Sequence, residues 1–256
     1  MSPSPSPSPL ALALALALAL ALALALALAL VACGSSPPPP PAIAPLEHLD
    51  LTTGGASPTD TLPLVVALHG RGDTADGFAR AFRDMPTAAR VVLLRAPVHE
   101  GQSGDAWFTF RHEHTWEHVA DDLDTQCDRI VATVDAIEAA HPSRGRPILT
   151  GFSQGGMIAY AMALRHPDRF AALYPVSGIL ITELYAHDHI DAPRVPPIVA
   201  FHGTRDEIIP IDADREAIAT LAARGVHVEL RPHDATHWLD GEMRADLWQH
   251  IGAAAE

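Results

Sequence analysis

The chain has 256 residues, of which 31 are acidic and 17 basic, and its formal net charge at pH 7 is −14. This acidity argues against a nucleic-acid-binding protein, because binding to phosphates needs a basic patch. Every basic residue is arginine, so the chemistry of a lysine Schiff base and of a lysine-containing phosphate loop is excluded.

The first 32 residues differ in composition from the rest of the chain. Residues 2–9 alternate Ser and Pro, residues 10–30 alternate Leu and Ala, and Cys33 follows Val31 and Ala32. This segment resembles a bacterial lipoprotein signal, which implies cleavage before Cys33 and attachment of lipid to it. Two alternatives stay open: an uncleaved anchor, since an apolar stretch of this length can span a bilayer, and a misassigned start codon.

Three regions are therefore expected along the chain. Residues 1–32 are a signal peptide or membrane anchor, residues 33–45 form a Ser/Pro-rich spacer, and residues 46–256 form one catalytic domain. The lipoprotein interpretation places this domain in a bacterial cell envelope, lipid-anchored and facing outside the cytoplasm, in the periplasm or at the outer membrane.

The domain alternates strand-like and helix-like segments. Apolar runs typical of buried parallel strands occupy residues 62–68, 91–95, 147–151, 170–176, 197–201 and 226–230. The clearest helix has one apolar face formed by Val119, Leu123, Cys127, Ile130, Val134 and Ile137. Thr115 is its expected N-cap and His141-Pro142 its end, and Cys127 is expected to be a small core residue. The alternation predicts a doubly wound, mostly parallel sheet with helices on both faces.

A motif for nucleophilic catalysis follows the third of these runs. Gly151-Phe152-Ser153-Gln154-Gly155 has the Gly-Xaa-Ser-Xaa-Gly pattern, with a predicted strand before it and a helix after it. This pattern is typical of a nucleophile elbow, a sharp turn between a strand and a helix. The serine in the turn adopts a strained backbone conformation, and glycines flank it because side chains there would collide with the neighbouring strand and helix. We therefore predict that Ser153 is a nucleophile.

A serine nucleophile needs a base and a carboxylate, which in this architecture follow it along the chain. Asp206 lies just past the strand predicted at residues 197–201, and His237 lies in the loop after the last predicted strand. His233 in the same loop is the alternative base. The backbone N–H groups of Arg71, in the loop after residues 62–68, and of Gln154 are the predicted oxyanion-hole donors.

Several aromatic residues lie between a predicted strand and the long helix. Trp107, Phe108, Phe110 and Trp116 either line an acyl pocket, Trp107 and Phe108 above all, or cover the edge of the sheet. His112, Glu113, His114 and His118 lack the spacing of a zinc motif, so a solvated loop that enters the long helix is expected there and no metal site. His202 is expected to form local hydrogen bonds, and residues 180–194 are a possible lid.

The strand, turn and loop segments of the domain, taken together, resemble the phospholipase/carboxylesterase branch of the α/β-hydrolases, which includes the acyl-protein thioesterases. The matching segments run from about residue 62 to 251 and include VVALHGRGD (65–73), AWF (106–108), residues 147–178 and FHGTRDEIIP (201–210). The resemblance implies an α/β-hydrolase fold and a triad of Ser153, Asp206 and His237. Where that family usually has glycine three residues before the histidine, this chain has Asp234.

The expected activity is that of a serine carboxylic-ester hydrolase that works through an acyl-enzyme intermediate and needs no metal or organic cofactor. The alternatives are a thioesterase with the same triad and a lipid-anchored binding protein without catalysis. The expected partners are a small or medium acyl ester and, through the N-terminal lipid or anchor, a membrane. Neither a nucleic acid nor a protein partner is expected.

Overall fold

The computed structural model describes residues 14, 18, 43–110, 115–185 and 190–256. The predicted signal or anchor, apart from Leu14 and Leu18, lies outside these residues, as do Cys33 and most of the predicted spacer. The chain divides into two compact units, Met1–Ala42 and Ile43–Glu256, and the description below concerns the second. Within the described part of the chain, no helix combines the length and apolar character needed to cross a bilayer.

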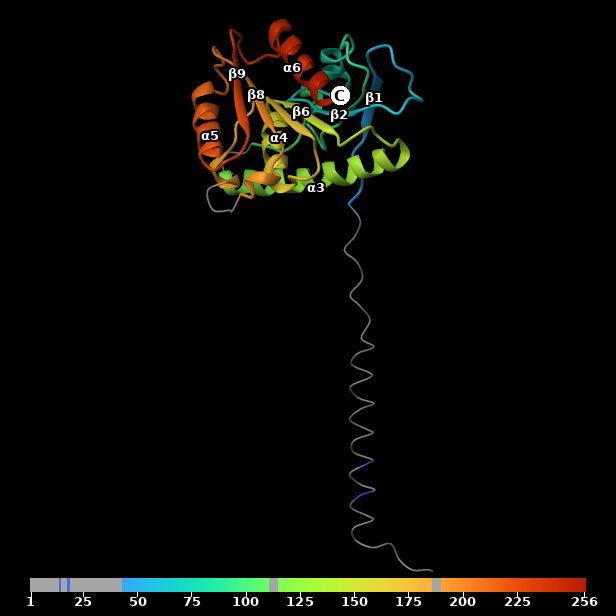
Figure 1. Ribbon diagram of the computed structural model, residues 1–256. Coiled ribbons are helices and arrows are strands. Elements are labelled where there is room, and N and C mark those ends of the chain that lie inside the picture. The colour runs from blue at the N-terminus through green and yellow to red at the C-terminus, as the bar shows by residue number, and fades with distance from the viewer. Residues whose placement is uncertain (1–13, 15–17, 19–42, 111–114, 186–189) are drawn as a thin grey trace, which may run out of the picture. The chain divides into compact units, whose positions relative to one another are not determined.

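Seven strands of the second unit form one sheet (Figure 1), and they pair in the order β1-β3-β2-β6-β7-β8-β9. They are β1 (His48–Thr52), β2 (Leu64–Leu68), β3 (Arg90–Leu94), β6 (Ile148–Phe152), β7 (Ala172–Val176), β8 (Ile198–Gly203) and β9 (Val228–His233). All neighbours pair in parallel except β1, which runs antiparallel to β3 at one edge. The six predicted strands are confirmed, and the predicted α/β fold with them.

Three short or exposed strands were not predicted. β1 is an edge strand whose residues are exposed or half-buried, so it lacks the apolar run of a central strand. β4 (Val98–His99) and β5 (Asp105–Ala106) form a separate two-stranded sheet, which an isolated bridge joins to Asp73. Two-residue strands are too short to leave a periodic pattern.

Helices cover both faces of the sheet. They are α2 (Ala75–Phe78), α3 (Trp116–Ala140), α4 (Gln154–Arg165), α5 (Ile211–Ala223) and α6 (Gly241–Ala254). Short 3₁₀ turns lie at η1 (Ala79–Ala81), η2 (Gly101–Ser103), η3 (Thr182–Leu184) and η4 (Ala192–Arg194). Apolar residues of α3, α4 and α5 belong to one core cluster, and those of α2 and α6 belong to a second. Figure 1 shows α3 and α6 on opposite sides of the sheet.

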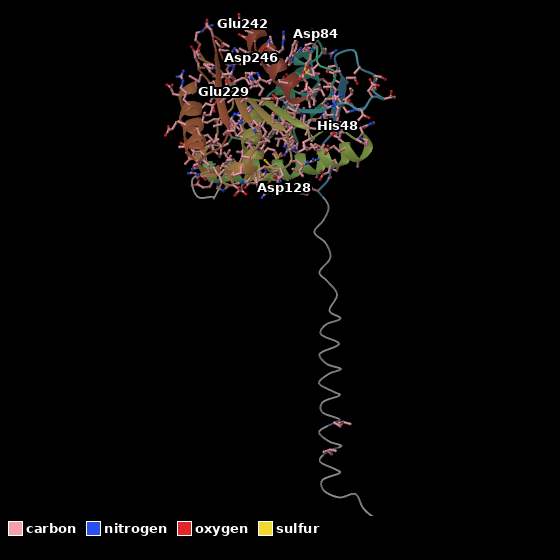
Figure 2. All side chains as sticks on the ribbon, viewed as in Figure 1. His48, Asp84, Asp128, Glu229, Glu242 and Asp246 are labelled. Atoms are coloured by element: carbon pink, nitrogen blue, oxygen red, sulfur yellow. The ribbon has the colours of Figure 1, made fainter. Side chains whose placement is uncertain are left out.

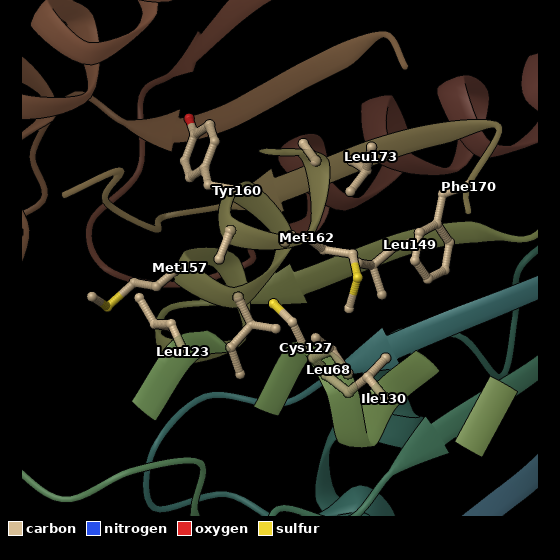
Figure 3. Packing of buried hydrophobic residues seen from close by; sticks show 14 of the residues in the cluster. Leu68, Leu123, Cys127, Ile130, Leu149, Met157, Tyr160, Met162, Phe170 and Leu173 are labelled. Carbon is tan, nitrogen blue, oxygen red and sulfur yellow. The ribbon is translucent and has the colours of Figure 1, made fainter. Parts of the chain in front are cut away.

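The long helix α3 forms as its sequence predicts. It begins after Thr115 and ends at Ala140, and the six predicted apolar residues are all buried. Figure 3 shows Leu123, Cys127 and Ile130 of this helix packed near side chains of α4 and the sheet. The Cys127 side chain has no exposed surface, and burial raises the pKa of its thiol well above its ordinary value. Cys127 is therefore an inert core residue, as predicted.

The negative charge of the domain is distributed over its surface. Asp84, Asp128, Glu229 and Glu242 are exposed, and Figure 2 shows them around the periphery of the domain. Ion pairs also link α3 to α4, for example the Nε atom of Arg165 with Oδ1 of Asp124 at 2.8 Å. Exposed pairs of this kind contribute about 0.5 kcal/mol each, so stability rests mainly on the two cores.

Candidate active site

Ser153 occupies a sharp turn between the strand β6 and the helix α4. Its φ is 53° and its ψ is −114°, and it is one of two non-glycine residues with positive φ in the described ranges. Such a conformation costs about 1–3 kcal/mol and is retained where the surrounding structure enforces it. The turn places the serine at the carboxyl end of β6, which is the edge where the loops of a parallel sheet meet.

Two glycines make this turn possible. A Cβ atom on Gly151 would lie 2.2 Å from the carbonyl oxygen of Gly155, and a Cβ atom on Gly155 would lie 2.4 Å from the carbonyl oxygen of Leu68. Both distances are far shorter than a carbon–oxygen contact allows, and both obstacles are backbone. The predicted reason for the glycines is therefore confirmed.

Ser153, His237 and Asp206 form one hydrogen-bonded chain. Nε2 of His237 lies 3.0 Å from Oγ of Ser153, and Nδ1 of His237 lies 2.7 Å from Oδ2 of Asp206. The second oxygen of Asp206 accepts the amide N–H groups of Ile208 at 2.9 Å and Ile209 at 2.8 Å. The Asp206 side chain has no exposed surface. The structure thus brings together the three residues that the sequence predicts for a triad.

The alternative base, His233, points elsewhere. It is the last residue of β9, its Nε2 lies 3.2 Å from Oδ2 of Asp246 in α6, and its ring stacks on Phe201. Asp234 is exposed and accepts a hydrogen bond from Nε of Arg205 at 2.6 Å. Asp234, at the position of the family glycine, thus pairs with Arg205 at the surface.

Neither of the two predicted oxyanion-hole amides has a hydrogen-bond acceptor among the described residues. Gln154 is the first residue of α4, so its N–H has no acceptor within the helix. In the loop after β2, the N–H of Gly72 donates to Asp105 at 2.9 Å and that of Asp73 donates to Gly70 at 3.2 Å, whereas the N–H of Arg71 donates to no backbone carbonyl of the described residues. Arg71 and Gln154 both line the cavity beside Ser153.

The side chain of Arg71 is turned toward Glu100. Its Nε and Nη2 atoms donate to the two carboxylate oxygens of Glu100, each at 3.0 Å. This hydrogen-bonded pair raises the pKa of the Arg71 guanidinium. Arg71 thus lines the cavity beside Ser153, while its guanidinium is paired with Glu100 at the surface.

The predicted pocket role of Trp107 and Phe108 is wrong. These side chains are 0% and 2% exposed, and neither lines a cavity at Ser153. The amide of Trp107 donates to Oε1 of Gln154 at 3.0 Å, and Nε2 of Gln154 donates to the carbonyl of Phe108 at 2.9 Å. The indole N–H of Trp107 donates to the carbonyl of His69 at 2.8 Å. Trp107 and Phe108 thus fix the side chain of Gln154 and the start of the loop after β2 by hydrogen bonds.

Two cavities flank Ser153. The larger, of about 610 Å³, has a mostly apolar wall formed by Phe110, Trp116, Met157, Ile179, Ile208, Ile209 and Pro210. The other, of about 500 Å³, includes the polar residues Asp73 and Arg80 together with Phe152 and Trp238. Arg71, Ser153, Ile208 and His237 line both cavities. Of the four aromatic residues, Phe110 and Trp116 line a cavity at Ser153, and their role as an acyl pocket stays a prediction.

Other residues singled out in the sequence do not join this site. His112, Glu113 and His114 lie outside the described residues, and the residues that are described contain no cluster of potential metal ligands. In the possible lid, residues 186–189 are likewise outside the description, while Leu180, Ile181 and Leu184 are buried. A lid function for residues 180–194 stays a prediction.

Comparison with known proteins places this site in a family. The sequence profile of the family described as Phospholipase/Carboxylesterase matches residues 56–254. A probable carboxylesterase of Oryza sativa subsp. japonica is 25% identical over 185 residues, which cover 67% of this chain and 79% of the relative. Acyl-protein thioesterase 1 of Gibberella zeae is 25% identical over 194 residues, which cover 64% of this chain and 78% of the relative.

The fold has solved counterparts. The crystal structure of the Bacillus cereus carboxylesterase superposes with a TM-score of 0.68 at 15% identity, covering 82% of this chain and 94% of that one. The expected α/β-hydrolase fold and the expected resemblance are both confirmed. From the extent of the profile match and the arrangement of β6, Ser153 and α4, the chain belongs to the phospholipase/carboxylesterase family of α/β-hydrolases.

Proposed function

We propose that this member of the family hydrolyses carboxylic esters with Ser153 as nucleophile, His237 as general base and Asp206 as the carboxylate that orients His237. The observation that carries the proposal is the unbroken chain of short contacts from Oγ of Ser153 through the His237 ring to Oδ2 of Asp206. A serine hydroxyl is a poor nucleophile without such a base, and the base needs an oriented partner.

The reaction proceeds in two halves. Nε2 of His237 takes the hydroxyl proton while Oγ of Ser153 attacks the ester carbonyl, and the amide N–H groups of Arg71 and Gln154 stabilise the oxyanion. His237 then gives the proton to the leaving alcohol, and the acyl-enzyme forms. Water attacks this intermediate with His237 as base again, which releases the acid and restores Ser153.

The two cavities suggest how the ester lies. The acyl chain occupies the larger cavity, because its wall of Met157, Ile179 and the aromatic residues offers apolar surface for a chain of small or medium length. The alcohol then extends into the second cavity, beside Asp73 and Arg80. A thioester would use the same groups, with sulfur as the leaving atom.

The first test is hydrolysis of aryl esters of increasing acyl length by the full-length chain and its Ser153→Ala variant. We expect turnover to fall by about 10⁶-fold in the variant, to near background. Ser177→Ala is the matched control, because Ser177 also follows a strand with positive φ, is fully buried and belongs to no catalytic contact. Turnover retained by Ser153→Ala would overturn the assignment of the nucleophile.

Two further measurements separate the alternatives. Rates on an oxygen ester and a thioester of the same acyl group, compared side by side, decide which leaving group is preferred. A serine-directed phosphonate that fails to label Ser153 in the folded chain would instead favour a binding protein without catalysis.

We extend the proposal to the cellular location of the protein, on the basis of its N-terminal segment. A lipid on Cys33 would tether the domain to the bacterial envelope through residues 33–45, outside the cytoplasm. The support is the sequence pattern at residues 10–33 alone. We expect metabolic labelling with a lipid precursor to mark the wild type and not the Cys33→Ala variant, and equal labelling would contradict the proposal.

A further inference from the structure

A second buried histidine lies directly behind Asp206. His202, near the end of β8, has no exposed surface. Its Nδ1 lies 3.0 Å from Oδ2 of Asp214, and its Nε2 lies 2.8 Å from the carbonyl oxygen of Ile209 and 3.4 Å from Oδ2 of Asp206. The charged groups that face His202 are therefore the two carboxylates of Asp206 and Asp214.

The partners of His202 determine how many protons it carries. The carbonyl of Ile209 can only accept a hydrogen bond, and so can an ionised carboxylate of Asp214. Both ring nitrogens therefore donate, which makes His202 an imidazolium. Burial lowers the pKa of His202, but the hydrogen bond and charge of Asp214, the carbonyl of Ile209 and the charge of Asp206 together raise it above its ordinary value.

Asp214 is held from its other side by Tyr160 of helix α4. The Tyr160 hydroxyl donates to Oδ1 of Asp214 at 2.7 Å, and both side chains are 1% exposed. Figure 3 shows the Tyr160 ring at the margin of the apolar cluster, with its hydroxyl directed away from that cluster. Burial, reinforced by the Asp214 carboxylate, raises the pKa of Tyr160 well above its ordinary value, so its hydroxyl stays a donor.

These contacts close a circuit around the active site. From Ser153, at the start of α4, the chain of contacts passes through His237, Asp206, His202 and Asp214 and returns to α4 at Tyr160. Ile209 is fixed twice, since its N–H donates to Asp206 at 2.8 Å and its carbonyl accepts from His202. The contact between His202 and Ile209 thus joins the two ends of the loop that carries Asp206.

We propose that His202 is a positioning residue of the triad: as an imidazolium held by Asp214, it fastens the loop after β8 and keeps the Asp206 carboxylate ionised and aimed at His237. This rests on the proposed function for Ser153, Asp206 and His237. His202 touches no substrate and lines neither cavity at Ser153, so it acts only through Asp206.

Asp214→Asn tests the proposal by removing charge while keeping shape. The amide oxygen can still accept from Tyr160, and the amide nitrogen can donate to Nδ1 of His202, which then becomes neutral. We expect kcat to fall about tenfold with KM within about twofold, far less than the roughly 10⁴-fold expected for loss of the triad carboxylate itself. The acid limb of kcat/KM should also move to higher pH by about half a unit. The variant loses both the His202 cation and the Asp214 anion, but the cation lies 3.4 Å from Asp206 whereas Asp214 lies at the other nitrogen of the ring, so protonation of the site becomes easier.

Asp212→Asn is the matched control. Asp212 lies two residues earlier, in the first turn of α5, is exposed and pairs with Arg215. This control should leave kcat and the pH profile unchanged. A purely structural role for Asp214 would lower the rate without moving the acid limb, and that result would overturn the proposal.

A second measurement does not require any ester to be cleaved. In ¹⁵N-histidine-labelled wild type, NMR should show one histidine that keeps protons on both ring nitrogens at a pH where exposed histidines have lost one. That signal should be absent from a folded Asp214→Asn protein. A neutral His202 with one protonated nitrogen would show that Asp214 carries the proton, and the proposal would fail even if the esterase assignment stands.

Discussion

Two loops meet at Ser153, and each begins with a buried histidine followed by glycine: His69-Gly70 after β2 and His202-Gly203 at the end of β8. Both histidine side chains have no exposed surface. Nδ1 of His69 donates to the carbonyl of Gly70 at 2.8 Å, and its Nε2 accepts the N–H of Ala96 at 3.2 Å. His69 is therefore neutral, whereas His202 faces acceptors with both nitrogens.

The two histidines differ in charge because their hydrogen-bond partners differ, and not because their burial differs. Burial lowers the pKa of His69 below its ordinary value, and its neighbours do not offset that effect. Burial acts in the same direction on His202, but Asp214 outweighs it and the pKa of His202 is raised. A neutral histidine suits the oxyanion loop, where only backbone is to be positioned. A cation suits the other loop, where it lies beside the buried carboxylate of Asp206.

The two glycines that follow these histidines should differ strongly in how much stability is lost when each is replaced by alanine. A Cβ atom on Gly203 would lie 2.4 Å from the carbonyl oxygen of Ala235 and 2.5 Å from that of Thr236, whereas one on Gly70 would lie 2.8 Å from a ring carbon of Phe152. Because backbone cannot give way as a side chain can, we expect Gly203→Ala to lower the free energy of unfolding by about 3 kcal/mol and Gly70→Ala by about 1 kcal/mol. Urea denaturation of both variants measures this, and equal losses would contradict it.

A smaller effect concerns pH: the contributions of the two histidines to folding stability should depend on pH in opposite directions. For His202 the raised pKa adds stability that is fully present below its ordinary value of 6.5 and is lost as pH rises through the higher folded value. For His69 the lowered pKa means that stability falls as pH drops below 6.5, because only the unfolded chain then binds the proton.

The measurement is the free energy of unfolding of wild type, His202→Gln and His69→Gln between about pH 5 and pH 9. The advantage of wild type over His202→Gln should shrink toward high pH, and its advantage over His69→Gln should shrink toward low pH. Parallel curves for the two variants would show that the histidines do not differ in charge.

The smallest expected effect concerns the side chain of Arg71. Its backbone N–H is the proposed oxyanion donor, while its guanidinium pairs with Glu100 at a half-exposed position. We expect Arg71→Gln to change kcat/KM by less than about threefold and stability by less than about 1 kcal/mol. A loss near 100-fold would mean that the side chain, and not the amide, acts on the substrate.

The site could be predicted from the sequence where a motif carries its own geometry. Gly151, Ser153 and Gly155 have roles fixed by a strand, a turn and a helix that adjoin in the chain. Asp206 and His237 were found because each follows a strand of a sheet whose order the motif implies. Trp107 and Phe108 were misjudged because a short aromatic run has no period that shows which side chains face the core.

The parallel strands, the helix α3 and the order of Ser153, Asp206 and His237 could be predicted from the chain alone, because apolar periodicity and local turn chemistry are properties of adjacent residues. Packing of distant elements was needed to show that Met157, Ile179 and Ile208 line one cavity and that Tyr160, Asp214 and His202 form one buried network. These residues come from separate strands, helices and loops. Their contacts, and the charge that those contacts give to His202, exist only once the elements have packed around Ser153.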